Sequence, residues 1–204
     1  GMKELEEGTF NLIVADPPYN LNKDFGVWKE AERRAEWHDW TRAWLTEAMR
    51  VLSDEGNIFV YGIHHHMCWV QCMMLEMGLI YRRQIIWNYE NGFAGYGKRS
   101  LNATYEPLLW FSKTGHYIYS PIREPYKSQE RLKHKIIKNG KVWEPHPDGR
   151  MVGDIWSFPT LAGRRFRDEK VDHPTQKPLS ISRRIVKHFS NTGDTILVPF
   201  VGSG

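Results

Sequence analysis

Short apolar runs alternate with longer amphipathic segments in the first half of the chain. The runs at 10–15, 57–63 and 79–89 are rich in β-branched and aromatic residues, which predicts buried strands. Residues 40–52 and 64–78 carry apolar side chains at helical spacing, which predicts two helices between these strands. The order strand, helix, strand, helix, strand is typical of a parallel sheet with helices packed on its faces.

Two residues mark where the predicted helices begin and end. Asp39 precedes the first amphipathic segment, and we expect its carboxylate to cap the N-terminus of that helix. Gly78 follows the second segment, at the position where helices often end in a left-handed residue.

The second half of the chain is less regular. Residues 104–113 predict a further strand, 173–190 a helix introduced by a proline, and 195–204 a last strand with a glycine turn. Residues 114–172 mix proline, basic and aromatic residues without a clear period. We therefore expect an α/β fold, a Rossmann-like, mostly parallel sheet with helices on both faces, into which 114–172 is inserted.

Positive charge is concentrated in this inserted segment. The whole chain has a net charge of +4, but residues 121–170 hold twelve Lys and Arg against seven Asp and Glu. A segregated basic segment favours a polyanionic partner such as nucleic acid. A solvated basic surface without a partner is the alternative interpretation.

The remaining composition excludes several classes of protein. The chain has 204 residues, 41% of them hydrophobic, which fits one soluble domain with an insertion. Two cysteines make no disulfide framework, and no apolar run approaches the roughly 18 residues of a membrane helix, so we expect a cytoplasmic protein with no membrane partner. His64, His65 and His66 precede Cys68, but further metal ligands are not apparent, and we expect no metal.

Residues with distinctive chemistry follow the first and the last predicted strand. Asp16-Pro17-Pro18-Tyr19 and the glycine turn from Phe200 to Gly204 both lie beyond carboxyl ends of strands, where ligands bind in open α/β sheets. Glycines let backbone N–H groups approach a carboxylate or phosphate. Each motif alone also suits a simple turn, so the pair carries more information than either member.

The Asp-Pro-Pro-Tyr turn presents hydrogen-bond acceptors beside an aromatic ring. Prolines donate no backbone hydrogen bond, and an ionised Asp16 only accepts. The complement of such a site is a planar group with two N–H donors that stacks on Tyr19. The exocyclic amino group of a nucleobase has these properties.

Three motifs in order, DPPY at 16–19, HPTQKP at 173–178 and PFVGSG at 199–204, resemble those of the DNA amino-methyltransferases that use S-adenosylmethionine. The permuted motif order, with the catalytic motif first, resembles the β class. The resemblance implies the class I methyltransferase fold in three parts: a catalytic part at 2–113, an inserted target-recognition segment at 114–172, and a cofactor-binding part at 173–204. An acid rather than a serine at the first motif position favours adenine N6 over cytosine N4.

The resemblance also implies the roles of individual residues. Asp16, Pro17, Pro18 and Tyr19 are the implied catalytic residues, acting on an adenine flipped out of the duplex. The cofactor S-adenosylmethionine is expected to contact residues from all three motifs: Asp16, Thr175, Gln176, Lys177, Phe200, Gly202, Ser203 and Gly204. Contacts with nucleic acid are expected from basic side chains: Lys98, Arg99, Arg131, Lys133, Lys135, Arg164, Arg165 and Arg167.

The implied function is a site-specific DNA adenine-N6 methyltransferase of a restriction-modification system. The expected partners are double-stranded DNA, a cognate restriction endonuclease and a second copy of the chain in a homodimer. A cytosine-N4 enzyme, a DNA-binding homologue without cofactor and an RNA substrate remain open as alternatives. Val198 stands where the family usually has an acid, which favours the DNA-binding homologue without cofactor. The resemblance also implies a further helix and strand, so we expect the natural sequence to continue beyond Gly204.

Overall fold

The computed structural model describes residues 1–21, 34–91, 99, 101–173 and 175–202, with the backbone alone for Gln129 and Arg131. The chain forms two compact units. The first comprises Gly1–Tyr119 and Asp154–Gly204, and the second Ser120–Gly153. In the described part of the chain, no helix combines the length and the apolarity needed to cross a bilayer.

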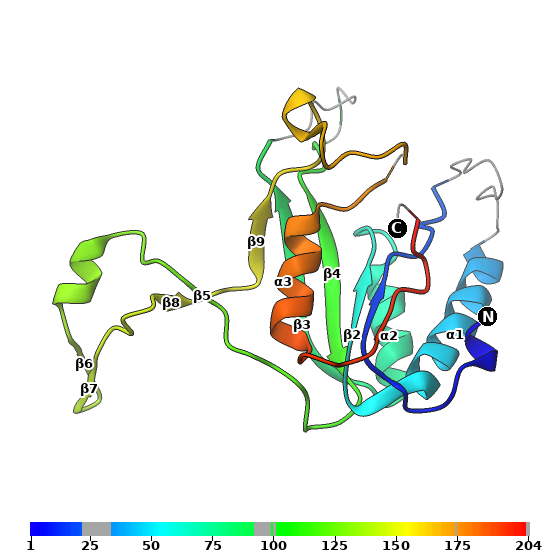
Figure 1. Ribbon diagram of the computed structural model, residues 1–204, viewed down its shortest axis with the longest axis horizontal. Helices are drawn as coiled ribbons and strands as arrows, with labels where there is room; N and C mark the ends of the chain where they lie inside the picture. The colour runs from blue at the N-terminus through cyan, green and yellow to red at the C-terminus, as the bar shows by residue number, and fades with distance from the viewer. Residues whose placement is uncertain (22–33, 92–98, 100, 174, 203–204) are drawn as a thin grey trace. The chain divides into compact units, whose positions relative to one another are not determined.

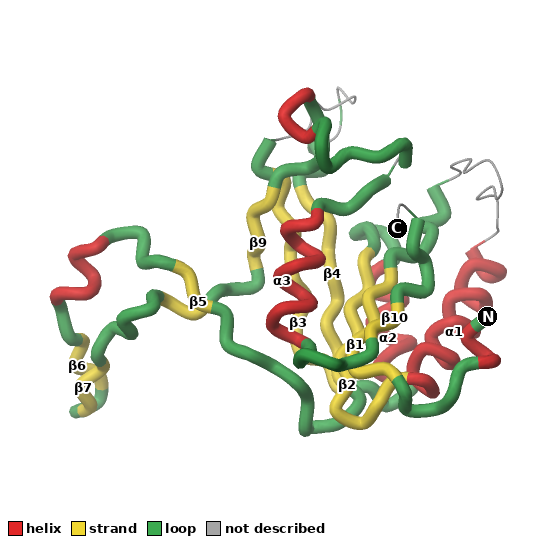
Figure 2. The backbone as a smooth tube through the Cα atoms, in the orientation of Figure 1, coloured by secondary structure: helices red, strands yellow, loops and turns green. Residues whose placement is uncertain are grey.

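The first unit is built on a six-stranded sheet in the order β10-β1-β2-β4-β3-β9 (Figures 1 and 2). Its strands are β1 (Phe10–Ala15), β2 (Leu52–Tyr61), β3 (Ile80–Tyr89), β4 (Tyr105–Ser112), β9 (Ile155–Phe158) and β10 (Ile196–Leu197). β4 is antiparallel to both β2 and β3, whereas the other three pairings are parallel. The predicted α/β fold with a mostly parallel sheet is therefore confirmed, and β4 is the exception within it.

Helices cover both faces of this sheet, as predicted (Figure 1). One face carries α1 (Arg34–Val51) and α2 (Met67–Glu76), and the other carries α3 (Leu179–Phe189). Successive residues of a strand point to opposite faces. Ile58 and Val60 of β2 accordingly join the core of α1 and α2, while the ring of Phe59 meets that of Phe189 on α3 at 4.8 Å.

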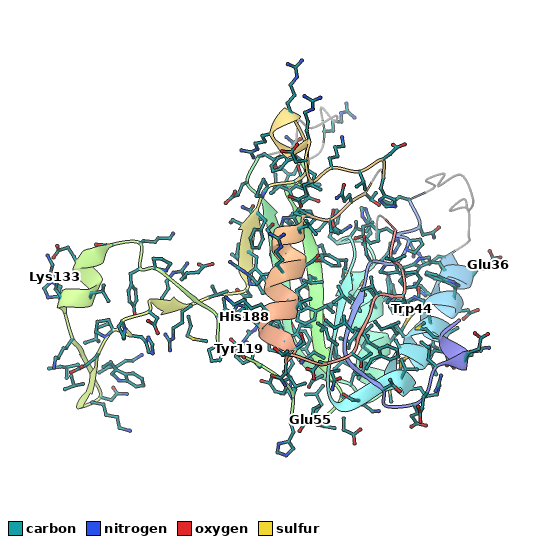
Figure 3. The ribbon with its side chains drawn as sticks, in the orientation of Figure 1. Glu36, Trp44, Glu55, Tyr119, Lys133 and His188 are labelled. Carbon is teal, nitrogen blue, oxygen red and sulfur yellow. The ribbon has the colours of Figure 1, made fainter. Side chains whose placement is uncertain are left out.

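Aromatic packing holds α3 to its face of the sheet. The ring of Phe189 lies 4.7 Å from that of Trp110 on β4 and 5.4 Å from that of Tyr119. Figure 3 shows Tyr119 beside the last turn of α3, near His188. Asn57, which is fully buried, accepts a hydrogen bond of 2.8 Å from the Trp110 indole, so this polar group is satisfied inside the core.

Several predicted boundaries are wrong, and one of them is the start of the helix predicted over 173–190, which begins only at Leu179 as α3. Asp39 does not cap a helix, because α1 is already helical at Arg34 and buries Trp37 in the core. The strand predicted over 57–63 begins five residues earlier, because β2 starts at Leu52 directly after α1. The register of β1 with β2 shifts between Phe10, which faces Leu52, and Leu12, which faces Asn57, so the extra residues are absorbed as an irregularity in the sheet.

The end of α2 agrees with the sequence. Gly78 has a φ of 87°, the left-handed conformation expected after the last helical turn. The helix itself is shorter than the predicted segment, and His64, His65 and His66 precede its first residue, Met67.

The second unit contains two short two-stranded sheets and the 3-10 helix η2 (Gln129–Lys133). β5 (Arg123–Glu124) pairs with β8 (Arg150–Met151), and β6 (Ile136–Lys138) pairs with β7 (Lys141–Trp143), both antiparallel. The turn between β6 and β7 has positive φ at Asn139 and Gly140, 52° and 71°, as two-residue hairpin turns require. The predicted inserted segment, 114–172, also includes residues 154–172, which contribute β9 to the sheet of the first unit. The role of the inserted segment in DNA recognition stays a prediction.

Candidate active site

The Asp-Pro-Pro-Tyr turn follows β1 directly. Within it, the hydroxyl of Tyr19 donates a hydrogen bond of 2.6 Å to Oδ1 of Asp16. The indole of Trp37 on α1 donates to the carbonyl oxygen of Pro18 at 3.2 Å, which attaches the turn to the helix beside it. The carbonyl of Pro17 accepts no hydrogen bond from the described residues, so it remains available as an acceptor.

Lys177 joins this turn from the other end of the chain. Its ammonium donates to Oδ2 of Asp16 at 2.8 Å, across 161 residues of sequence. The same nitrogen lies 3.5 Å from Oε2 of Glu106, and the Lys177 side chain is only 12% exposed. The DPPY and HPTQKP motifs therefore meet in a largely buried cluster of one ammonium and two carboxylates.

Glu106 was not among the site residues predicted from the sequence. This residue is the second of β4, where its side chain points to the same face of the sheet as Leu108 and Trp110. The hydroxyl of Tyr89 donates to Oε1 of Glu106 at 2.8 Å, and that of Tyr19 lies 3.3 Å from Oε2. The available signal was a single acid in an otherwise apolar strand, since a buried carboxylate needs partners.

Two tyrosine rings enclose the ammonium of Lys177. Its nitrogen lies 5.4 Å from the ring centre of Tyr19 and 5.3 Å from that of Tyr61 at the end of β2, within the range of cation–π attraction. The hydroxyl of Tyr61 is buried and has no hydrogen-bond partner among the residues that the structure describes.

Burial and the two carboxylates determine the protonation of this cluster. Burial lowers the pKa of Lys177, but the charges of Asp16 and Glu106 outweigh it, and the net shift of the Lys177 pKa is upward. Burial, followed by the charge of Asp16, raises the pKa of both Tyr19 and Tyr61 well above the usual value. Near neutral pH the cluster therefore holds an ammonium and neutral phenols.

The glycine turn lies next to helix α1 and to His173 of the HPTQKP motif. The ring of Phe200 packs against those of Trp40 and Trp44 on α1, at 5.7 and 5.2 Å. Gly202 has a φ of 57°, and a Cβ added there would lie 3.1 Å from the imidazole of His173. The PFVGSG and HPTQKP motifs are thus in contact, and a side chain at residue 202 would be strained.

Residues 10–204 match the DNA methylase family N6_N4_Mtase. The chain belongs to this family. The methylase is 31% identical to the type II methyltransferase M1.MboII of Moraxella bovis, over 100% of this chain and 80% of that protein. It is 30% identical to the DNA adenine methyltransferase YhdJ of Escherichia coli (strain K12), over 99% of this chain and 68% of that protein.

Solved structures share the fold of the methylase. The complex of M1.HpyAVI with SAM aligns with a TM-score of 0.58 and 21% identity, over 96% of this chain and 74% of that one. The PvuII DNA methyltransferase, which is cytosine-N4-specific, aligns with a TM-score of 0.67 and 11% identity, over 97% and 69%. At these identities the likeness concerns the fold alone.

The region around the glycine turn has the features of a ligand site. Nε1 of Trp44, whose ring packs against Phe200, is buried without a hydrogen-bond partner in the described part of the methylase. Buried polar groups are normally satisfied, so this atom calls for a polar ligand nearby. The left-handed backbone at Gly202 would let such a ligand approach closely.

Other predicted cofactor residues hold the loop that leads into α3. The side-chain amide of Gln176 accepts from the backbone of Val171 and donates to that of Glu169, both at 2.8 Å. The backbone of Thr175 donates to the imidazole of His173 at 3.4 Å. Ser203 and Gly204 lie outside the described residues. Roles of these residues in cofactor binding stay predictions.

The predicted DNA contacts are divided between the two units. Arg164, Arg165 and Arg167 are exposed on or next to η3 (Arg164–Phe166) in the first unit. Lys133 and Lys135 belong to the second unit, where they pair with Glu130 and Glu144. Arg99 is exposed, whereas Lys98 and the side chain of Arg131 lie outside what the structure describes. None of these contacts is tested by the structure.

A cavity of about 360 Å³ lies on the opposite face of β4. Its lining comprises His64, Met67, Cys68, Gln71, Cys72, Gln84, Tyr105 and Pro107. Tyr105 and Pro107 flank Glu106 in sequence and point away from it, so this cavity is separate from the Asp16 cluster. In the described ranges, no group of three or more His, Cys, Asp or Glu residues is arranged to hold a metal ion.

Proposed function

We propose that this methylase transfers a methyl group from S-adenosylmethionine to N6 of an adenine flipped out of double-stranded DNA. The observation that carries the proposal is the buried cluster in which the DPPY carboxylate meets Lys177 beyond the carboxyl end of β1. The acid at the first motif position and the name of the relative YhdJ, a DNA adenine methyltransferase, support adenine over cytosine.

The residues around the glycine turn fit this cofactor. Phe200 and Gly202, with the buried indole N–H of Trp44, would hold it beside the Asp16 turn. When bound, S-adenosylmethionine supplies an electrophilic methyl group, and the bonding electron pair stays with its sulfur as the methyl passes to nitrogen.

Asp16 and Pro17 orient the amino group of the target base. Two N–H donors meet two acceptors there, the Asp16 carboxylate and the Pro17 carbonyl, and this pairing directs the nitrogen lone pair away from the turn. Flipping the base out of the duplex costs a few kcal/mol. Stacking on the ring of Tyr19 recovers roughly 1–3 kcal/mol of this cost.

Asp16 also receives the proton that the reaction releases. The nitrogen gains a carbon and must lose one of its hydrogens to become neutral again. The carboxylate that holds this N–H is the nearest acceptor, so the proton passes to Asp16 and then to water. The chain's own catalytic contribution is therefore positioning and proton acceptance.

The names of two relatives support a restriction-modification setting for this activity. M1.MboII and M.HpaI are both called type II methyltransferases. We propose a cognate endonuclease with the same recognition site as a partner, and a homodimer as the assembly.

Methyl transfer from tritiated S-adenosylmethionine to mixed-sequence DNA tests the proposed function, with the methylated nucleoside identified by mass spectrometry. We expect N6-methyladenine, and a loss of about 100-fold or more in rate for Asp16→Ala. Glu7→Ala, an exposed acid before β1 and so at the opposite end of this strand from Asp16, is the control and should keep full activity. N4-methylcytosine as product would replace adenine by cytosine, and full activity of Asp16→Ala would remove Asp16 from the mechanism.

Calorimetric titration with S-adenosylmethionine separates an enzyme from a DNA-binding homologue. A methylase should release or absorb heat as the cofactor binds. No binding and no methyl transfer, together with tight DNA binding, would favour the homologue without cofactor.

A further inference from the structure

We propose that Glu106 is an alternative hydrogen-bond acceptor for the two groups that donate to Asp16, the ammonium of Lys177 and the hydroxyl of Tyr19. When these donors move to Glu106, Asp16 can accept hydrogen bonds from the target amino group. This inference rests on the proposed function for its catalytic meaning. Its structural part, that Lys177 can exchange between two acids, is independent of any substrate. Glu106 would be a positioning residue, since it acts through Lys177 and Tyr19.

Both carboxylate oxygens of Asp16 already accept a hydrogen bond. Oδ1 accepts from the hydroxyl of Tyr19 at 2.6 Å, and Oδ2 accepts from Lys177 at 2.8 Å. An amino group that binds Asp16 must therefore displace one of these donors or share its oxygen. A displaced donor at a buried site needs another acceptor, because an unpaired buried ammonium is strongly destabilising.

One atom serves as the alternative acceptor for both donors. Oε2 of Glu106 lies 3.3 Å from the hydroxyl of Tyr19 and 3.5 Å from the ammonium of Lys177. A shift of about 0.7 Å, the difference between 3.5 and 2.8 Å, would give Lys177 the same distance to Glu106 as it now has to Asp16. The Lys177 nitrogen lies 5.4 Å from the ring centre of Tyr19 and 5.3 Å from that of Tyr61. A shift of about 0.7 Å therefore keeps the ammonium near both rings.

Glu106 is held firmly enough to act as this second position. Its other oxygen, Oε1, accepts from Tyr89 at 2.8 Å, and Tyr89 ends the neighbouring strand β3. The carboxylate is 19% exposed, less than the 24% of Asp16. Asp16 lies on a turn that must admit a substrate. Glu106 lies within β4, where it pairs with Trp87 of the long strand β3.

Thermal unfolding without DNA or cofactor tests the exchange directly. Asp16→Asn and Glu106→Gln should each lower Tm by roughly 4 °C or less, because Lys177 keeps one acid in each variant. The double variant should lose more than the sum, roughly 10 °C or more, because the buried ammonium has no acid left. Adding Lys177→Met to the double variant should restore most of the loss.

The controls make every outcome decisive. Glu7→Gln removes an exposed acid and should leave Tm unchanged. If the double variant does not fold but the triple variant does, the stranded ammonium is again the cause, and the proposal stands. Additive losses in the double variant, or a triple variant as unstable as the double, would overturn it.

Single-turnover methyl transfer at saturating cofactor and DNA tests the catalytic meaning. Glu106→Gln should slow the reaction about tenfold or more while the Kd for DNA is unchanged, because Lys177 then stays on Asp16. Lys177→Met in that background should raise the rate again, which a merely structural role of Glu106 would not produce. If the wild type transfers no methyl group, the proposed function fails while the unfolding result still decides the exchange; an active wild type with a fully active Glu106→Gln variant contradicts the positioning role.

Discussion

Tyr61 ends β2 with its hydroxyl buried and, among the described residues, unpaired. A buried phenol that ionises would face the charges of Asp16 and Glu106, so burial first and these acids second raise its pKa well above 10.0. The folded protein therefore keeps this proton at a pH where the unfolded chain releases it. The stability that results is present below about pH 10 and is lost as the pH rises above that value.

Tyr61→Phe removes this dependence. We expect the variant to match the wild type within about 1 kcal/mol at pH 7, since the lost hydroxyl makes no hydrogen bond to the described residues. Above pH 10 its Tm should fall less steeply than that of the wild type. Thermal unfolding followed by circular dichroism between pH 8 and 11 measures both effects; two superimposable curves would contradict the assigned cause.

Among the secondary-structure elements, the hairpin of β6 and β7 stands out by its exposed side chains. Ile137 and Trp143 are 75% and 60% exposed, and Lys138 lies directly opposite Lys141 across the turn. Like charges in this position destabilise a hairpin, and a two-stranded hairpin is marginal even without them. Neutralisation by phosphate groups would remove this repulsion, which makes the hairpin tip a candidate contact with the DNA backbone.

The pair Lys138→Gln and Lys141→Gln tests this contact. We expect weaker DNA binding and a plot of log Kd against log salt that is shallower by roughly 1.8, about 0.9 for each lost phosphate contact. Fluorescence anisotropy with a labelled duplex at several salt concentrations measures the slope. Lys3→Gln, on the exposed N-terminal turn of the first unit, is the matched control, and a slope equal to the wild type in the hairpin variant would reject the contact.

At the scale of the whole molecule, the two units differ in what they contain. The sheet, its three helices and the Asp16 cluster all belong to the first unit, whose core residues come from both sides of the second unit in the sequence. The second unit buries little of its own apolar surface, as Ile136, Val142 and Met151 illustrate. The first unit should therefore fold without it.

Replacement of residues 121–152 by a Gly/Ser linker of equal length tests this independence. We expect Tm to change by no more than a few degrees, because a flexible surface loop of this length adds little entropic cost. Binding of S-adenosylmethionine should persist while affinity for duplex DNA falls at least tenfold. Loss of the cooperative transition would show that the second unit is required for the fold.

Local patterns were sufficient for most elements. β1 and β3 follow from hydrophobic periods and from proline and glycine at their ends, because these signals act over a few residues. α2 and α3 were predicted as helices, but they begin later than predicted, at Met67 and Leu179. The predicted start of α1 was wrong. Trp37 is buried and its indole donates to the carbonyl of Pro18, so the helix begins before Asp39, at Arg34. No capping residue in the local sequence indicates this earlier start. In the second unit, strands of two or three residues are too short to show a period.

The sequence by itself determined which chemical groups this methylase has at its strand ends: the acceptor turn at Asp16 and the glycine turn at Gly202. Only the tertiary structure decided which groups meet. Lys177 reaches Asp16 across 161 residues, and Glu106 enters the cluster because β4 runs antiparallel between β2 and β3. Strand order and direction depend on contacts between distant segments, and such contacts leave no mark on the local pattern of residues.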